Sequence, residues 1–274
     1  MPAPVSTTAY RYPGEILVLL VTISVVFGVI ALMATVTVCV SLVFVLGVVL
    51  LSYSATRRHH QDLLNRAQQV TPQTAPNLAR QASICLKRLQ PGEVQIFLVP
   101  SRRLNAYTFG LSSPKGVVLY SALVQVMDAD EIRFILGHEL GHVRLGHTWL
   151  NSLIGGMAGI PSTLFINTLL ALVFRGWNRT CEYSADRAGL LACGSLDKAV
   201  SAMVKLVTPD RDLTSHELEN ALQRLDREDD DPLNLLGEIF STHPLLIKRI
   251  ARLRQYAATP AYRRLQALVD ANLA

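Results

Sequence analysis

Charged side chains are scarce in this sequence and unevenly distributed. Only 17% of the 274 residues are charged and half are apolar, with neither internal repeats nor low-complexity tracts. This composition argues against a disordered chain or a coiled coil. Residues 1–127 carry ten Lys and Arg against three Asp and Glu, whereas residues 128–274 carry sixteen against eighteen. The basic surplus lies beside the most apolar part of the chain, which favours a lipid bilayer with an anionic surface over nucleic acid as a partner.

Cysteine is also scarce. The four cysteines are Cys39, Cys85, Cys181 and Cys193, and none forms a Cys-x-x-Cys pair. A disulfide framework is therefore not expected, and a reducing compartment is the simpler interpretation.

No charged residue occurs from position 16 to position 56. One membrane span needs about 20 apolar residues, so this run predicts a transmembrane helical hairpin, with one long tilted span as the alternative. It is too long for a signal-peptide core. Arg57 and Arg58 follow, and because basic residues flank spans mostly on the cytoplasmic side, we expect the rest of the chain there. We divide the chain into an N-terminal tail (1–15), the transmembrane segment (16–56), a linker with helices (57–92) and a C-terminal domain (93–274).

The C-terminal domain is predicted to be α+β and mainly helical. Alternating apolar residues predict three short strands, at 94–99, 105–110 and 117–120, which we expect to form a small antiparallel sheet. Asp128 and Glu131 have the spacing of a capping box, so a helix should begin just after them.

The candidate site lies in the middle of that helix, at His138-Glu139-Leu140-Gly141-His142. Residues four apart share one helix face, so His138 and His142 can place both imidazoles on one metal ion. Glu139 lies one position around the helix, where it can reach a water on that metal without binding the metal itself. The pattern is typical of catalytic zinc sites, and a pair of core or surface histidines is the structural alternative.

A catalytic zinc site with two histidines needs a third protein ligand. The candidate is Glu182, on a predicted helix, and Asp186 four residues later could accept a hydrogen bond from a ligating imidazole. His147 lies nine residues after His138, one fewer than the longer three-histidine pattern requires, so we interpret it as a helix-end residue.

A second uncharged apolar stretch, 149–174, separates the two parts of this site. Two crossings of a membrane need about 40 residues, and a single crossing would place Glu182 on the opposite side from His142. We therefore expect a buried or membrane-dipping hairpin with a break between Gly155 and Pro161.

On these residues the sequence resembles the membrane-anchored gluzincin endopeptidases that include the heat-shock protease HtpX and the CAAX prenyl proteases. The resemblance covers residues 75–255 and includes Thr242-His243-Pro244 with Arg249. It implies a zincin-type domain with one Zn2+ per chain, a bacterial inner or cell membrane location and a role in protein quality control. In such proteins an Asn-Ala-aromatic edge strand binds substrate backbone, which assigns that role to Asn105, Ala106 and Tyr107. The His-Pro histidine stabilises the oxyanion, which assigns that role to His243.

The expected reaction is hydrolysis of peptide bonds in unfolded or membrane polypeptides, with Glu139 as the general base. The multi-span body of the prenyl proteases has no counterpart in this sequence, which argues against prenylated substrates. A catalytically silent membrane scaffold and a structural zinc site are the alternatives. Glu139 argues against the scaffold, and the positions of the cysteines argue against a closed four-ligand site. The oligomeric state does not follow from the sequence.

Overall fold

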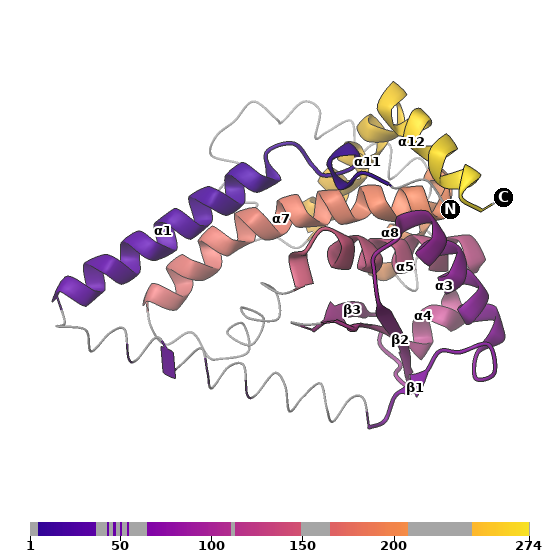
Figure 1. Cartoon of the computed structure of the whole chain (residues 1–274), viewed down its shortest axis with the longest axis horizontal. Helices are drawn as coiled ribbons and strands as arrows, with labels where there is room; N and C mark the ends of the chain where they lie inside the picture. Colours follow the sequence, from indigo (N-terminus) through magenta and orange to yellow (C-terminus); the bar gives the residue numbers. More distant parts are fainter. Residues whose placement is uncertain are drawn as a thin grey trace.

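The computed structural model describes residues 5–36, 65–110, 113–148, 165–207 and 243–273, with the single residues 43, 46, 47, 50 and 54. It describes the side chains in these ranges except at 36, 165–173, 175 and 243–245. The elements, labelled as in Figure 1, are η1 (Thr7–Ala9), α1 (Glu15–Val36), β1 (Gln68–Gln69), α3 (Pro76–Leu89), β2 (Val94–Val99), β3 (Ala106–Phe109), β4 (Lys115–Tyr120), α4 (Ser121–Val126), α5 (Ala129–Arg144), α7 (Phe165–Cys193), α8 (Leu196–Val207), α11 (His243–Ala257) and α12 (Pro260–Ala271). The prediction of a mainly helical fold with a small sheet is confirmed.

The four strands form one mixed sheet in the order β1-β2-β4-β3. β1 pairs antiparallel with β2, and β3 pairs antiparallel with β4, but β2 and β4 are parallel. The prediction of an antiparallel sheet is therefore wrong. The reason is that β4, whose four middle residues are buried, takes an inner position, so that β2 and β3 cover its two edges instead of pairing with each other. β3 is left at the edge of the sheet.

Helix α5 lies between the sheet and α7 (Figure 1) and contacts both. The core around it includes Leu136 and Leu140 of α5 and Leu190 of α7, all fully buried. The axes of α5 and α7 can approach closely because Gly141 has no side chain: a Cβ there would lie 2.6 Å from the Cβ of Ala188. This close approach brings the side chains of the two helices together at one point.

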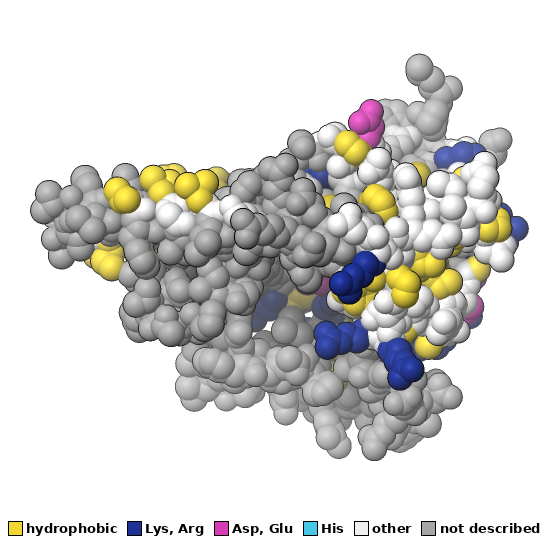
Figure 2. Space-filling view, turned by 90° about the horizontal axis from the view of Figure 1, so that it is seen from below, with side chains coloured by type: hydrophobic (Ala, Val, Ile, Leu, Met, Phe, Trp, Pro, Cys, Tyr) yellow, Lys and Arg dark blue, Asp and Glu magenta, His cyan; other side chains and the backbone are white. Residues whose placement is uncertain are grey.

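Helix α1 projects from this body beside the first half of α7 (Figure 1). Val18 and Leu19 of α1 pack there against Trp177 and Cys181 of α7. The segment Glu15–Thr35 has a mean hydropathy of 3.0 and is long and apolar enough to cross a membrane. Its exposed apolar side chains include Leu17, Phe27 and Leu32. Figure 2 shows hydrophobic side chains at the surface of the left end of the molecule. The part of the chain that the structure describes therefore contains one candidate membrane helix, near the N-terminus.

The structure describes only part of the two predicted hairpins. The second arm of the transmembrane hairpin lies almost wholly outside the described residues, as do Arg57 and Arg58. Residues 149–164 of the predicted membrane-dipping hairpin also lie outside them. The remainder of that stretch, 165–174, is the beginning of the continuous helix α7.

Candidate metal centre

The helix that carries the first two candidate ligands begins where the sequence predicts. The Asp128 side chain accepts hydrogen bonds from the backbone N–H groups of Asp130 and Glu131, and the Glu131 carboxylate accepts the backbone N–H of Asp128 at 2.8 Å. This capping box fixes the first turn of α5. Three turns later, His138 and His142 lie on one buried face, with their Nε2 atoms 3.2 Å apart.

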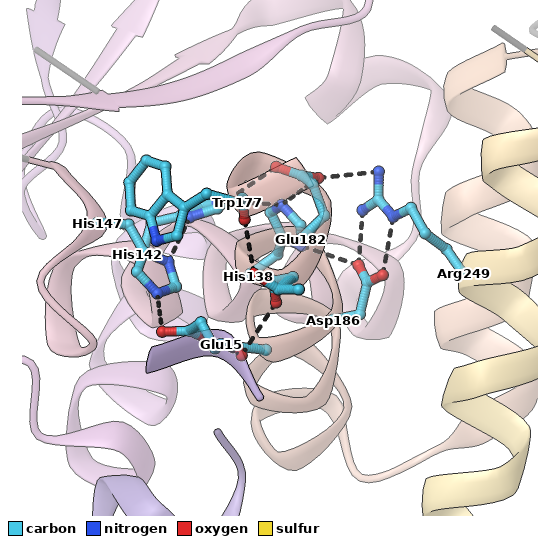
Figure 3. Close-up of polar contacts among 10 residues, drawn as sticks. Glu15, His138, His142, His147, Trp177, Glu182, Asp186 and Arg249 are labelled. Carbon is cyan, nitrogen blue, oxygen red and sulfur yellow. Dashed lines mark hydrogen bonds and ion pairs between the residues drawn. The ribbon is translucent and has the colours of Figure 1, made fainter. Parts of the chain in front are cut away.

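Helix α7 brings Glu182 to the same point (Figure 3). Its Oε2 lies 3.5 Å from His138 Nε2, and its Oε1 lies 3.4 Å from His142 Nε2. The ligand atoms of the three residues all lie within 4.8 Å of one another. Two imidazoles and one carboxylate are the protein ligands of a common class of catalytic zinc site, so these residues fit a bound zinc ion in both chemistry and spacing.

A second carboxylate of α7, Asp186, lies behind His138. Its Oδ1 is 3.0 Å from His138 Nδ1, so when His138 is neutral Nδ1 carries the proton and Nε2 keeps its lone pair for a metal. Arg249 of α11 donates through Nε and Nη2 to the two oxygens of Asp186, at 2.8 and 2.6 Å. Its Nη1 lies 3.0 Å from Glu182 Oε2. One guanidinium therefore joins both carboxylates of the cluster.

These charges shift the pKa values of the cluster. Burial raises the pKa of Glu182, but Arg249 and His138 outweigh this effect and hold it well below its usual range. Burial disfavours the His138 cation, but Glu182 and Asp186 outweigh it and raise the pKa of His138 to about 10. The point where the three side chains meet therefore attracts positive charge, which suits a metal cation.

Glu139 and strand β3 face one cavity of about 410 Å³ beside the two histidines. The lining residues are Asn105, Ala106, Tyr107, Thr108, Phe134, Ile135, His138, Glu139, His142, Glu182, Leu206 and Arg249. Glu139 is only 7% exposed, and burial raises the pKa of its carboxyl although His138 and His142 oppose the shift. A carboxylate whose pKa is raised toward neutrality is a more effective general base.

Sequence reasoning did not recognise His147, which lies next to His142, and Glu15, which lies next to His147, as neighbours of the site. Helix α5 ends at Arg144, and Gly146, at φ +81°, turns the chain back. As a result His147 Nδ1 lies 3.0 Å from His142 Nδ1, and His147 Nε2 lies 3.0 Å from Glu15 Oε1. The interpretation of His147 as a helix-end residue describes its position but misses these contacts. A glycine directly before a histidine at a helix end, and a lone carboxylate at the start of an uncharged run, are the signals that could have indicated them.

The remaining candidates are placed as follows. His243 is the first residue of α11, but its side chain lies outside the described residues, so its role stays a prediction. Cys85, Cys181 and Cys193 are free and buried. No cysteine belongs to the group of possible metal ligands that His138, His142 and Glu182 form among the described residues.

Two imidazoles and a carboxylate that meet beside a buried glutamate, in a chain with an apolar N-terminal helix, define the class of membrane-associated, metal-dependent peptidases. The chain belongs to peptidase family M48, whose sequence profile matches residues 66–257.

Proteins with similar sequences are named as proteases or metallopeptidases. Protease HtpX homologues of Moorella thermoacetica and Bifidobacterium longum are 26% and 27% identical to it over 226 and 233 residues. These matches cover 69% and 70% of this chain and 75% and 74% of those proteins. The plastoglobule-localized metallopeptidase 48 of Arabidopsis thaliana chloroplasts is 33% identical over 109 residues, which are 37% of this chain and 31% of that protein. The chain is a membrane-associated metalloprotease similar to HtpX.

Proposed function

We propose that this chain is a zinc endopeptidase with one Zn2+ bound by His138, His142 and Glu182. The observation that carries the proposal is the convergence of their ligand atoms within 4.8 Å, beside Glu139 in a cavity that an edge strand lines. A silent scaffold with the same fold would have no use for a buried carboxylate next to the metal ligands, so Glu139 favours an active enzyme.

Glu139 is the proposed general base and acid. It accepts a proton from the attacking water and delivers it to the leaving amine. Zinc, when bound, polarises the scissile carbonyl and lowers the pKa of water. Asp186 holds His138 in the tautomer that leaves Nε2 unprotonated, and Arg249 keeps both carboxylates ionised. We assign oxyanion stabilisation to His243 on the basis of the family resemblance.

The substrate is proposed to bind as an added strand along β3. Two observations support this: β3 is the last strand in the sheet order, and Asn105, Ala106 and Tyr107 line the cavity that contains Glu139. Backbone hydrogen bonds would then supply the affinity, and sequence selectivity would be loose. Unfolded polypeptides and extended segments of membrane proteins offer such a backbone, which fits a role in protein quality control.

We propose that α1 anchors the chain in the cell membrane with the metal centre on the cytoplasmic side, as expected for Arg57 and Arg58 after the apolar run. The domain division and the membrane-dipping hairpin at 149–174 stay part of this proposal. Thiol labelling of a Ser83→Cys variant tests the proposed orientation in the membrane, because Ser83 is exposed. With Cys39 replaced by Ser, an impermeant reagent should label inside-out vesicles. Labelling of right-side-out cells alone would contradict the orientation.

Zinc content and casein cleavage by the full chain in detergent micelles test the proposed activity. We expect one zinc ion per chain, and cleavage that stops on chelation and returns with added zinc. Glu139→Gln should keep its zinc and lose cleavage, whereas His142→Ala should lose both. Casein cleavage by Glu139→Gln at the wild-type rate would contradict the proposal.

A further inference from the structure

A line of three buried side chains leads from the metal centre to the head of helix α1 (Figure 3). His142 Nδ1 lies 3.0 Å from His147 Nδ1, and His147 Nε2 lies 3.0 Å from Glu15 Oε1. The residues are 6%, 2% and 1% exposed, in the same order. Buried polar groups need hydrogen-bond partners, and His142 Nδ1 and both ring nitrogens of His147 have theirs in this line. We call Glu15, His147 and His142 the Glu15 relay.

The Glu15 carboxylate, at one end of the Glu15 relay, determines which ring nitrogens of His147 and His142 carry protons. An ionised carboxylate only accepts hydrogen bonds, so His147 Nε2 donates to Glu15. A neutral His147 that donates through Nε2 has its lone pair on Nδ1, which accepts the Nδ1 proton of His142. His142 then keeps its lone pair on Nε2, the atom 3.4 Å from Glu182 Oε1 and 3.2 Å from His138 Nε2. The relay thus selects the tautomer of His142 that can bind a metal.

Glu15 is itself held at both carboxylate oxygens. The Ser184 hydroxyl donates to Oε2, and the Arg11 guanidinium donates to Oε1. The backbone N–H of Tyr12 donates to Ser184 Oγ at 2.8 Å. Because Ser184 lies on α7 between the two carboxylates of the metal centre, these contacts fasten the head of α1 to the turns of α7 that hold the site.

The environment of Glu15 differs from that of the residues that follow it in α1. Ile16 and Leu17 are 49% and 66% exposed, as suits a helix surrounded by lipid. A buried carboxylate costs free energy unless it is paired and hydrogen-bonded. A helix that served only as an anchor would need no such group, so the burial of Glu15 beside the metal centre indicates a second role.

We propose that Glu15 is a positioning residue of the metal centre, which acts through His147 on the ligand His142. This inference rests on the zinc site proposed above and extends it, because the membrane helix then supplies part of the metal centre. A shift of α1 against α7 would displace the acceptor of His147 and weaken metal binding. Membrane anchoring and metal affinity are thereby coupled.

The sulfur of Cys181 lies close to the same groups, within 4.8 Å of the ligand atoms of Glu15 and His147. A second cation could bind these three residues only if Glu15 and His147 gave up their mutual hydrogen bond. The relay therefore predicts that the chain binds no second ion at this place.

The test uses the full chain in detergent and the variants Glu15→Met, His147→Phe and the double variant. Zinc affinity is measured by chelator competition, and ligand geometry by the visible spectrum of the cobalt-loaded protein. Each single variant should bind zinc about 10–100-fold more weakly and show an altered cobalt spectrum. The double variant should be no weaker than the weaker single variant, because both changes break one line. Glu15→Gln keeps an acceptor oxygen for His147 and should retain most of the affinity.

Glu93→Met is the matched control, since Glu93 is exposed and should bind zinc as the wild type does. Wild-type affinity and cobalt spectrum in Glu15→Met would overturn the relay, as would additive losses of affinity in the double variant. A wild-type protein that binds two zinc ions, of which Glu15→Met loses one, would also overturn it. If Glu15→Met does not fold without metal, wild-type affinity in His147→Phe overturns it instead. His142→Ala separates the two proposals: unchanged zinc content in that variant would refute the zinc site itself.

Discussion

Arg249 and Asp186 form a two-pronged ion pair, in which Nε and Nη2 of the guanidinium donate to the two carboxylate oxygens at 2.8 and 2.6 Å. The Asp186 side chain is 2% exposed, and the pKa of its carboxyl is lowered because the charge and hydrogen bonds of Arg249 outweigh the effect of burial. The pair connects α11 to the back of the metal centre.

Removal of this guanidinium should destabilise the fold. Arg249→Met leaves two carboxylates without their counter-charge, and the loss of one partner of a buried pair costs about 3–5 kcal/mol. Arg249→Lys keeps the charge but not the two-pronged geometry, so its stability should lie between that of Arg249→Met and that of the wild type. Thermal unfolding in detergent measures both variants, with Arg252→Met on the exposed side of α11 as the control. An unchanged unfolding midpoint for Arg249→Met would contradict the account.

Asp186 should contribute to metal affinity without binding the metal. Asp186→Ala removes the acceptor of His138 Nδ1, and such a loss lowers metal affinity or activity about 10–100-fold. Asp186→Asn keeps an acceptor oxygen and should lose less. Chelator competition measures both affinities, and equal affinity of Asp186→Ala and the wild type would show that Asp186 does not orient His138.

The close approach of α5 and α7 should be sensitive to one methyl group. A Cβ at position 141 would lie 2.6 Å from the Cβ of Ala188 and 3.3 Å from the Cα of Ala185. Gly141→Ala should therefore separate the helices, at a cost of about 1–3 kcal/mol, and draw His142 away from Glu182. Ala188→Gly removes the nearest contact, so the double variant should recover zinc affinity that Gly141→Ala loses. No recovery in a zinc titration would mean that the helix contact does not set the site.

Acid should destabilise the protein through Glu131. Burial raises the pKa of this carboxyl, but Lys205, Ser201 and the backbone of Asp128 outweigh it and lower the pKa below 4.5. The folded state then binds its proton less readily than the unfolded chain does. The stabilisation is therefore present above about pH 4.5 and is lost as the pH falls through the lower folded-state pKa.

Glu131→Gln measures this contribution. Its unfolding midpoint should be lower than that of the wild type at pH 7, and should fall less steeply below about pH 4.5. The exposed Glu93→Gln serves as the control for a general charge effect. Parallel pH profiles for Glu131→Gln and the wild type would contradict the prediction.

Short-range patterns were sufficient to predict the helix geometry of the candidate site. The capping box and the spacing of His138 and His142 depend only on helix geometry, and the four-residue spacing of Glu182 and Asp186 does as well. The close packing of α5 against α7 is harder to predict from sequence, because it depends here on the absence of a side chain at Gly141.

Contacts between distant parts of the chain could not be predicted in this way. Glu15 and His147 are separated by 132 positions, and their contact depends on how α1 lies on α7. The parallel pairing of β2 and β4 likewise depends on which strand takes the inner position of the sheet, and strand periodicity does not encode that order.

The central claim is that His138, His142 and Glu182 bind one zinc ion, and diffraction measured on both sides of the zinc absorption edge tests it most directly. The account predicts a single anomalous peak per chain, in contact with Nε2 of both histidines and with the Glu182 carboxylate. A peak elsewhere, or no peak between these three side chains in protein that cleaves casein, would contradict it.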